Sequence, residues 1–230
     1  MKSEYHRHCP AIFAMACLCL LAGCQSSQQF ARKVGLAEQP KRPGNFYLDE
    51  ETIVEVERVA LLPVHAPAAG LANEAEIDAQ FLSKLTATQL FEVVSISRED
   101  LARRFGQRSF SSAGILNQSL FNYIQTTTAA DAVVLFDITS YHPFQPIRVG
   151  VRGKLITLQD QHVLWAVDEL FDAGAQHISR DAEAYEKRHM AQFPTSKQHD
   201  SILMSPSRFI AYAAERCILT LPPNSLNDNF

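Results

Sequence analysis

Near the start of the chain, an aliphatic residue and two small residues stand directly before a cysteine, in the run Leu21-Ala22-Gly23-Cys24. This pattern fits the lipobox at which bacterial lipoprotein precursors are cleaved, after which the cysteine carries acyl chains and becomes the new N-terminus. Lys2 and Arg7 give a basic start, and an uncharged apolar run from Ala11 to Leu21 follows. That run is shorter than the roughly 20 residues needed to cross a bilayer, as expected of a signal peptide. We therefore predict a lipoprotein signal peptide over residues 1–23, ending in the Leu21, Ala22 and Gly23 recognition residues, and lipidation (palmitate-type acylation) at Cys24.

The competing interpretation of this region is a buried N-terminal helix. A small-residue pair directly before a cysteine is not expected of a core helix, so the signal peptide is favoured. Loss of the leader then leaves Cys217 as the one cysteine besides the lipidated Cys24. An intramolecular disulfide is excluded, and a hydrophobic core must hold the fold. Cys217 lies in an apolar segment and is expected to be a small buried hydrophobe rather than a reactive thiol.

The predicted anchor also gives a location. More than one acyl chain makes membrane attachment stable, whereas a single chain binds marginally. The second residue after Cys24 is Ser26 and not the aspartate that retains enterobacterial lipoproteins in the inner membrane. By analogy with that rule, we expect the chain on the periplasmic face of the outer membrane, attached through its lipid.

Composition fits a packed globular protein and is not basic enough to suggest nucleic-acid binding. The whole chain has a formal net charge of −4, and removal of the leader makes the remainder slightly more acidic. Hydrophobic residues make up 47% of the sequence, and the length allows one ordinary domain. A polar segment with Pro40 and Pro43 predicts a lipidated N-terminus and flexible tether over residues 24–52. We expect a globular domain over residues 53–221 and a frayed tail over 222–230.

Hydrophobic periodicity predicts alternating strands and helices within that domain. The expected fold is α/β (α+β), a single domain in which helices flank a mixed β-sheet of about four to five strands. Expected strands cover residues 56–64, 91–97, 132–141, 147–154 and 162–171, and expected helices cover 74–90, 97–105, 116–124, 182–190 and 207–219. Ser97 and Ser205 are the expected helix caps, and Gly106 is the expected helix stop.

The two strands at 147–154 and 162–171 are expected to form a half-buried hairpin. Apolar residues of the first strand alternate with Arg148 and Arg152, and Val163, Trp165, Val167 and Phe171 are expected on one face of the second. Trp165 is interpreted as a core aromatic residue, with an interface anchor as the less favoured alternative. The possible interface residues are Arg148, Arg152, Trp165 and Asp168.

Two stretches resemble a group of bacterial envelope lipoproteins. The first is Ala130-Asp131-Ala132, followed by an apolar strand and Ile138-Thr139-Ser140-Tyr141; the second is the hairpin turn before Leu164-Trp165, with Asp168-Glu169 and Phe171-Asp172-Ala173 after it. The group contains the periplasmic domain of the curli secretion channel, a flagellar outer-membrane lipoprotein, the outer-membrane activators of peptidoglycan synthases and the amino-terminal domain of the Tol-system propeller protein. The resemblance implies a similar mixed α/β fold. This chain departs from the curli channel, because no second pair of long alternating strands is present to build a pore. Its tether is also shorter than an activator that reaches an inner-membrane enzyme would need.

Candidate chemistry rests on acidic residues near strand ends. Paired carboxylates or a metal site could form from Asp131, Asp137, Asp168, Glu169 and Asp172. The favoured alternative is that these acids cap turns or pair with Arg148 and Arg152 across the hairpin. The histidines show no metal-binding spacing, and the sequence contains no nucleotide-binding loop or serine-nucleophile motif. No cofactor, metal or catalytic residue is predicted.

These observations favour a non-catalytic lipoprotein that binds another envelope component or assembles with itself. Two alternatives remain open: a subunit of a secretion or flagellar envelope assembly, and an envelope hydrolase that uses the strand-end carboxylates.

Overall fold

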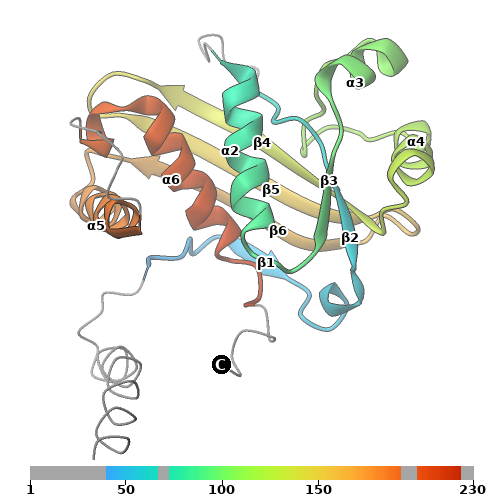
Figure 1. Cartoon of the computed structure of the whole chain (residues 1–230), viewed down its shortest axis with the longest axis horizontal. Helices are drawn as coiled ribbons and strands as arrows, with labels where there is room; N and C mark the ends of the chain where they lie inside the picture. The colour runs from blue at the N-terminus through green and yellow to red at the C-terminus, as the bar shows by residue number, and fades with distance from the viewer. Residues whose placement is uncertain (1–39, 67–72, 193–200, 224–230) are drawn as a thin grey trace, which may run out of the picture. The chain divides into compact units, whose positions relative to one another are not determined.

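The computed structural model describes residues 40–66, 73–192 and 201–223. The described residues from Lys41 onward cluster as one compact unit. Within the described part, six strands form one sheet and five α-helices accompany it (Figure 1). The predicted α/β class is confirmed, and the sheet has one strand more than the upper expectation.

The sheet is mixed, with strands in the order β1-β6-β5-β4-β2-β3. The neighbours β2, β3 and β4 run parallel, whereas β4, β5, β6 and β1 form an antiparallel succession. The strands are β1 (Phe46–Leu48), β2 (Arg58–Leu61), β3 (Glu92–Ser95), β4 (Ala132–His142), β5 (Arg148–Thr157) and β6 (Val163–Asp172). Parallel neighbours need crossover connections, and the helices supply them.

Two crossovers place helices on opposite faces of the sheet. The helix α2 (Glu74–Thr86) connects β2 to its neighbour β3, and α3 (Arg98–Phe105) with α4 (Gln118–Thr128) connects β3 back past β2 to β4. The connections run in opposite directions along the sheet. Because crossovers are right-handed, opposite directions require opposite faces.

The remaining helices follow the hairpin. They are α5 (Gln176–Gln192) and α6 (Pro206–Ile218), and short 3₁₀ turns occupy Ile53–Glu55 (η1) and Ile202–Met204 (η2). Figure 1 shows α2 and α6 side by side in front of the sheet. The first core joins this helical layer to one sheet face through residues such as Phe81, Phe136, Trp165 and Tyr212. A smaller second core lies under α3 and α4 and contains Leu101, Leu120 and Ile124.

Local sequence signals account for the ends of α3. The Ser97 hydroxyl accepts a hydrogen bond from Asp100 N at 3.1 Å, and Gly106 closes the helix with a φ of 71° in the left-handed region. Both predictions are confirmed. At α6, Ser205 occupies the N-cap position before Pro206, but its side chain makes no capping hydrogen bond. Instead its carbonyl oxygen accepts from Phe209 N at 2.9 Å.

The tether prediction needs a correction near its end. Phe46–Leu48 forms the edge strand β1 along β6, within the range expected to be flexible up to residue 52. Leu48 packs against the first core, and Asp49 N donates to Leu164 O at 2.8 Å. Three residues are too few to show a sheet period in the sequence, so packing against β6 decides their conformation.

The hairpin prediction is confirmed except at Val163. A register shift between Leu155 and Ile156 inserts an extra residue, Leu164, into β6. The bulge turns Val163 to the second core, while Trp165, Val167 and Phe171 face the first. The helix α5 also begins earlier than the expected residue 182.

Candidate functional site

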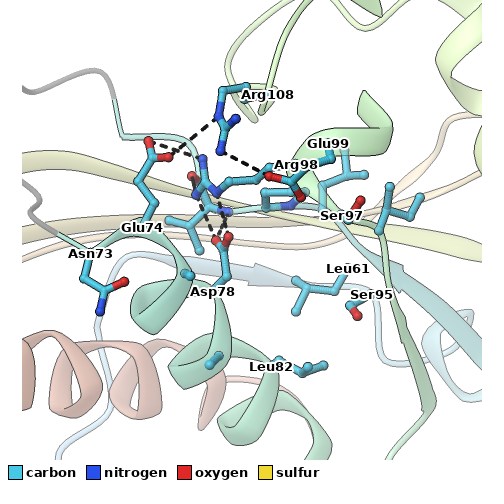
Figure 2. A pocket seen from close by; sticks show the side chains of 16 residues that line it. Leu61, Asn73, Glu74, Asp78, Leu82, Ser95, Ser97, Arg98, Glu99 and Arg108 are labelled. Carbon is cyan, nitrogen blue, oxygen red and sulfur yellow. Dashed lines mark hydrogen bonds and ion pairs between the residues drawn. The ribbon is translucent and has the colours of Figure 1, made fainter. Parts of the chain in front are cut away.

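A hollow of about 720 Å³ lies where the parallel strands β2 and β3 end and the helices α2 and α3 begin (Figure 2). We call it the α2–α3 pocket. In open α/β sheets this edge is where ligands commonly bind, because connections depart there to opposite faces. Its apolar wall comes from β2, its extension and the inner face of α2, with Leu61, Leu62, Pro63, Val64, Ala75, Ala79 and Leu82.

The fixed point of this pocket is the buried guanidinium of Arg98. Its side chain is 8% exposed and forms a two-point contact with Asp78, Nε–Oδ2 at 2.7 Å and Nη2–Oδ1 at 2.9 Å. Nη2 also donates to Val64 O at 2.8 Å, and Nη1 lies 3.4 Å from Glu74 Oε1. Asp78 Oδ1 in turn accepts from Val64 N at 2.8 Å. These contacts join α3, α2 and the end of β2 into one rigid corner.

The rim is a looser set of charges. Figure 2 shows Arg108 above the pocket, between Glu74 and Glu99. Its guanidinium lies 3.9 Å from Glu74 and 3.4 Å from Glu99, and its side chain is more than half exposed. Pairs this open contribute about 0–1 kcal/mol each, so Arg108 can move to meet a bound group.

The candidate acids of the sequence are held by partners. Asp137 is buried and accepts from the backbone N–H and the hydroxyl of Ser112. Asp131 accepts from Glu57 N and Arg58 N at 3.1 and 2.9 Å and so secures the start of β2. These contacts support the interpretation as turn and strand caps rather than as an acid–base pair.

The hairpin acids pair with the arginines expected for them. Arg152 contacts Asp168 through Nε at 2.8 Å and Nη2 at 2.7 Å, while Arg148 Nε lies 4.0 Å from Asp172. The register places Asp137, Arg152 and Asp168 side by side on β4, β5 and β6. Arg152 therefore lies between the two carboxyls. Glu169 points elsewhere, toward a smaller cavity beside Lys41 and Arg42.

The four possible interface residues divide into two groups. Arg148, Arg152 and Asp168 lie on the sheet face opposite Trp165, where Tyr47 and Leu170 are 51% and 52% exposed. We call this area the open sheet face. Trp165 is 0% exposed and donates from Nε1 to Thr220 Oγ1 at 2.7 Å. The structure therefore places Trp165 in the core, where a partner does not reach it.

The predicted lipidation site lies outside the residues that the structure describes, and so does the rest of the lipobox, so both stay predictions. Across residues 40–66, 73–192 and 201–223, no helix is long and apolar enough to cross a bilayer. The same residues contain no group of three or more His, Cys, Asp or Glu side chains that could hold a metal ion. Cys217 is buried as expected, and burial raises the pKa of its thiol.

A second polar cluster joins α2, α5 and α6. Lys84 Nζ and His189 Nε2 approach Glu215 Oε2 at 2.8 and 3.2 Å. Burial alone would raise the pKa of Glu215, but hydrogen bonds from His189 and Lys84 outweigh it and lower the pKa to about 2. The carboxylate therefore stays charged throughout the physiological range.

This cluster predicts acid sensitivity. The folded pKa of Glu215 is below its ordinary value of 4.5, so its stabilising contribution is complete above that pH and is lost as the pH falls toward 2. The shift corresponds to about 3 kcal/mol. In urea unfolding across this pH range, Glu215→Gln is expected to lower stability at pH 7 and to weaken the loss between pH 4.5 and 2. Glu99→Gln, at an exposed carboxyl, is the control, and equal pH profiles for both variants would contradict the assignment.

Sequence reasoning did not find the α2–α3 pocket. Arg98 follows the correctly predicted cap Ser97, but its partner Asp78 lies 20 residues earlier on another helix. Asp78 stands among the apolar residues of α2 at a spacing found in many surface helices, so the sequence does not mark it as a partner of Arg98. The two residues come together in the fold, where β2 and β3 pair and place α2 beside α3.

Comparison with known proteins gives loose structural likenesses. No protein-family model matches the chain, and no curated protein sequence matches it either. A PelC dodecamer from Paraburkholderia phytofirmans is 12% identical, with a TM-score of 0.39 over 59% of this chain and 86% of that one. Lipoprotein GNA1162 from Neisseria meningitidis is 12% identical, with a TM-score of 0.37 over 61% and 99%. The LpoB C-terminal domain from Escherichia coli is 15% identical, with a TM-score of 0.36 over 50% and 81%. At these scores the likenesses carry no argument about function, and the fold rests on the contacts described above.

Proposed function

We propose that this chain is a lipid-anchored envelope lipoprotein whose α/β domain binds another envelope component without catalysing a reaction. The location, the periplasmic face of the outer membrane, rests on the run Leu21-Ala22-Gly23-Cys24 and on Ser26 after it. The resemblance of residues 130–141 and 158–173 to envelope lipoproteins agrees with this location.

The observation that carries the binding role is the construction of the α2–α3 pocket. Its volume falls within the range of about 300–1,000 Å³ typical of binding sites. Its wall is apolar, while Arg98 is held by three groups, those of Asp78, Val64 and Glu74, and the exposed Arg108 stands at the rim. A preformed apolar hollow with a rigid charged corner suits an apolar side chain of a partner flanked by polar groups. The open sheet face, with Arg148, Arg152 and Asp168, is a second contact area.

Site-specific crosslinking in intact envelopes tests this proposal. A photoreactive amino acid at Arg108 is expected to form an adduct with a discrete envelope protein, and the same group at Arg103, on the exposed side of α3, is not. Ser95→Trp places a large ring at the pocket wall and should abolish the adduct, whereas Glu92→Trp on the same strand should leave it. An adduct that survives Ser95→Trp would overturn the binding site. Mass spectrometry of the membrane-extracted protein is expected to show an acylated Cys24 at the N-terminus, and an intact Met1 would overturn the anchor.

The two alternative functions predict different results. A subunit of a secretion or flagellar assembly would elute as a closed oligomer, and native mass measurement would report its copy number. A hydrolase would lose activity on substitution of Asp168 with no change in melting temperature. The pairing of Asp168 with Arg152 speaks against free acid–base chemistry there.

A further inference from the structure

A second cavity, separate from the α2–α3 pocket, lies among the last turns of α2, α5 and α6 and has a volume of about 630 Å³. We call it the three-helix cavity. Figure 1 shows α2 and α6 running beside each other, with α5 at the edge of the same layer. Its lining residues are Ser83, Lys84, Ala87, Thr88, Arg188, His189, Glu215, Ile218 and Leu219.

The charges on this lining are unequal. Lys84 and Arg188 are cationic and His189 can become so, whereas Glu215 is the acid among the lining residues. Glu215 Oε2 already accepts from both Lys84 and His189, and Lys84 also lies over the Tyr185 ring, 5.2 Å from its centroid. Arg216 Nη1 also lies 3.5 Å from Glu215 Oε1. The carboxylate of Glu215 is therefore shared by three partners, and the positive charge of Arg188 is left uncompensated among the lining residues.

Arg188 presents a buried donor without an acceptor. Its Nη2 atom is buried and finds no hydrogen-bond partner among the residues that the structure describes. An unsatisfied buried polar group costs about 1–3 kcal/mol, and more when it is charged. Folded proteins keep few such groups, and a functional role, a bound water or a bound ion is the usual reason for one.

The helix ends alone do not account for this arginine. Lys84 and His189 are the basic residues of the last turns of α2 and α5, where they complement the negative end of each helix dipole. Carbonyls at the ends of α2 and α6 accept from following backbone groups: Ser83 O from Ala87 N at 3.0 Å, and Glu215 O from Leu219 N at 2.9 Å. Arg188 Nη2 donates neither to a free carbonyl at a helix end nor to a carboxylate among the described residues.

We propose that the three-helix cavity binds a small carboxylate with an apolar chain, whose carboxylate pairs with Arg188. A guanidinium forms a strong, charge-assisted hydrogen bond with a carboxylate. A monoanion fits better than a phosphate dianion, because Glu215 repels each added negative charge. The apolar chain fits against Ala87, Ile218 and Leu219, since the cavity is much larger than a carboxylate group.

Thermal unfolding of the purified full chain tests this site, with sodium hexanoate as the probe. Hexanoate is expected to raise the melting temperature saturably, and hexanamide, which has the same chain without the charge, is expected not to. Arg188→Gln should weaken hexanoate binding by about tenfold to a hundredfold. Arg180→Gln removes an exposed arginine of the same helix and should leave binding unchanged.

The outcomes separate clearly because each variant is compared with and without the probe. A stability change caused by Arg188→Gln itself therefore does not obscure the result. Equal stabilisation by hexanamide, equal or greater stabilisation by inorganic phosphate, or unchanged binding in Arg188→Gln would each overturn the proposal. The test is independent of the α2–α3 pocket, since Ser95→Trp should leave hexanoate binding intact.

Discussion

Arg98→Ala is expected to lower the free energy of unfolding by about 3–5 kcal/mol. The substitution leaves the Asp78 carboxylate, whose side chain is 26% exposed, without its main partner, and it leaves Val64 O without its donor. Loss of one partner of such a pair is costly because the other partner has already lost most of its water. Urea unfolding at pH 7 measures the change, and the midpoint should fall while the denaturant slope is unchanged.

Arg103→Ala is the matched control, on the same helix. Arg103 pairs with Asp100 one turn away, but its side chain is 77% exposed. Exposed pairs contribute about 0–1 kcal/mol, so this variant should be close to the parent chain. Similar losses in Arg98→Ala and Arg103→Ala would show that the corner of the α2–α3 pocket is not held as described.

Trp165→Ala is expected to cost about 3–5 kcal/mol, the range for removing a large aromatic side chain from a core. The ring is 0% exposed, lies edge-on to Phe136 with centroids 5.9 Å apart, and donates to Thr220. Thermal or urea unfolding measures the loss. Leu170→Ala, on the same strand but 52% exposed, should cost far less. Equal costs would place Trp165 outside the core.

Gly153 allows a second test of how Trp165 packs in the core. A Cβ atom at Gly153 would lie 2.5 Å from Trp165 Cη2 and 2.8 Å from Phe136 Cε1. Gly153→Ala should therefore cost about 1–3 kcal/mol through overpacking. In the Trp165→Ala background the tightest contact is gone and the same change should cost less. A double-mutant cycle gives the coupling, and strict additivity would contradict the packing of the indole over this glycine.

Elements with local signals were predictable from sequence, and elements decided by tertiary pairing were not. The cap Ser97 and the stop Gly106 delimit α3 because both act within one helical turn. The alternation around Arg148 and Arg152 predicted the hairpin for the same reason. Strand β1 escaped prediction because its conformation depends on β6, more than 100 residues later in the chain.

The same distinction holds for the sites. Arg152 and Asp168 could be paired from the hairpin register, since cross-strand neighbours follow from the turn. The corner of Arg98 and Asp78 and the cavity around Arg188 could not be predicted in this way. Each depends on how helices distant in sequence pack together, and hydrophobic periodicity does not give that packing. Trp165 was correctly favoured as a core residue because Val167 shares its face of the strand, although the bulge turns the other valine used in that prediction, Val163, to the second core.

The edge strand β1 bears on how the domain would respond to mechanical force. With an anchor at Cys24, tension first reaches Lys41, whose backbone N donates to Asp181 Oδ1 at 3.4 Å, and the buried Pro43. It then reaches Asn45, which exchanges hydrogen bonds with Asp168 through its side chain and its carbonyl at 2.9 and 3.1 Å. A pull from that end separates β1 from β6 one residue pair after another, and each freed residue adds about 3.3–3.6 Å to the tether. Because β1 lies at the edge of the sheet and pairs with β6 alone, we expect it to detach first, while the other five strands stay paired and the tether lengthens.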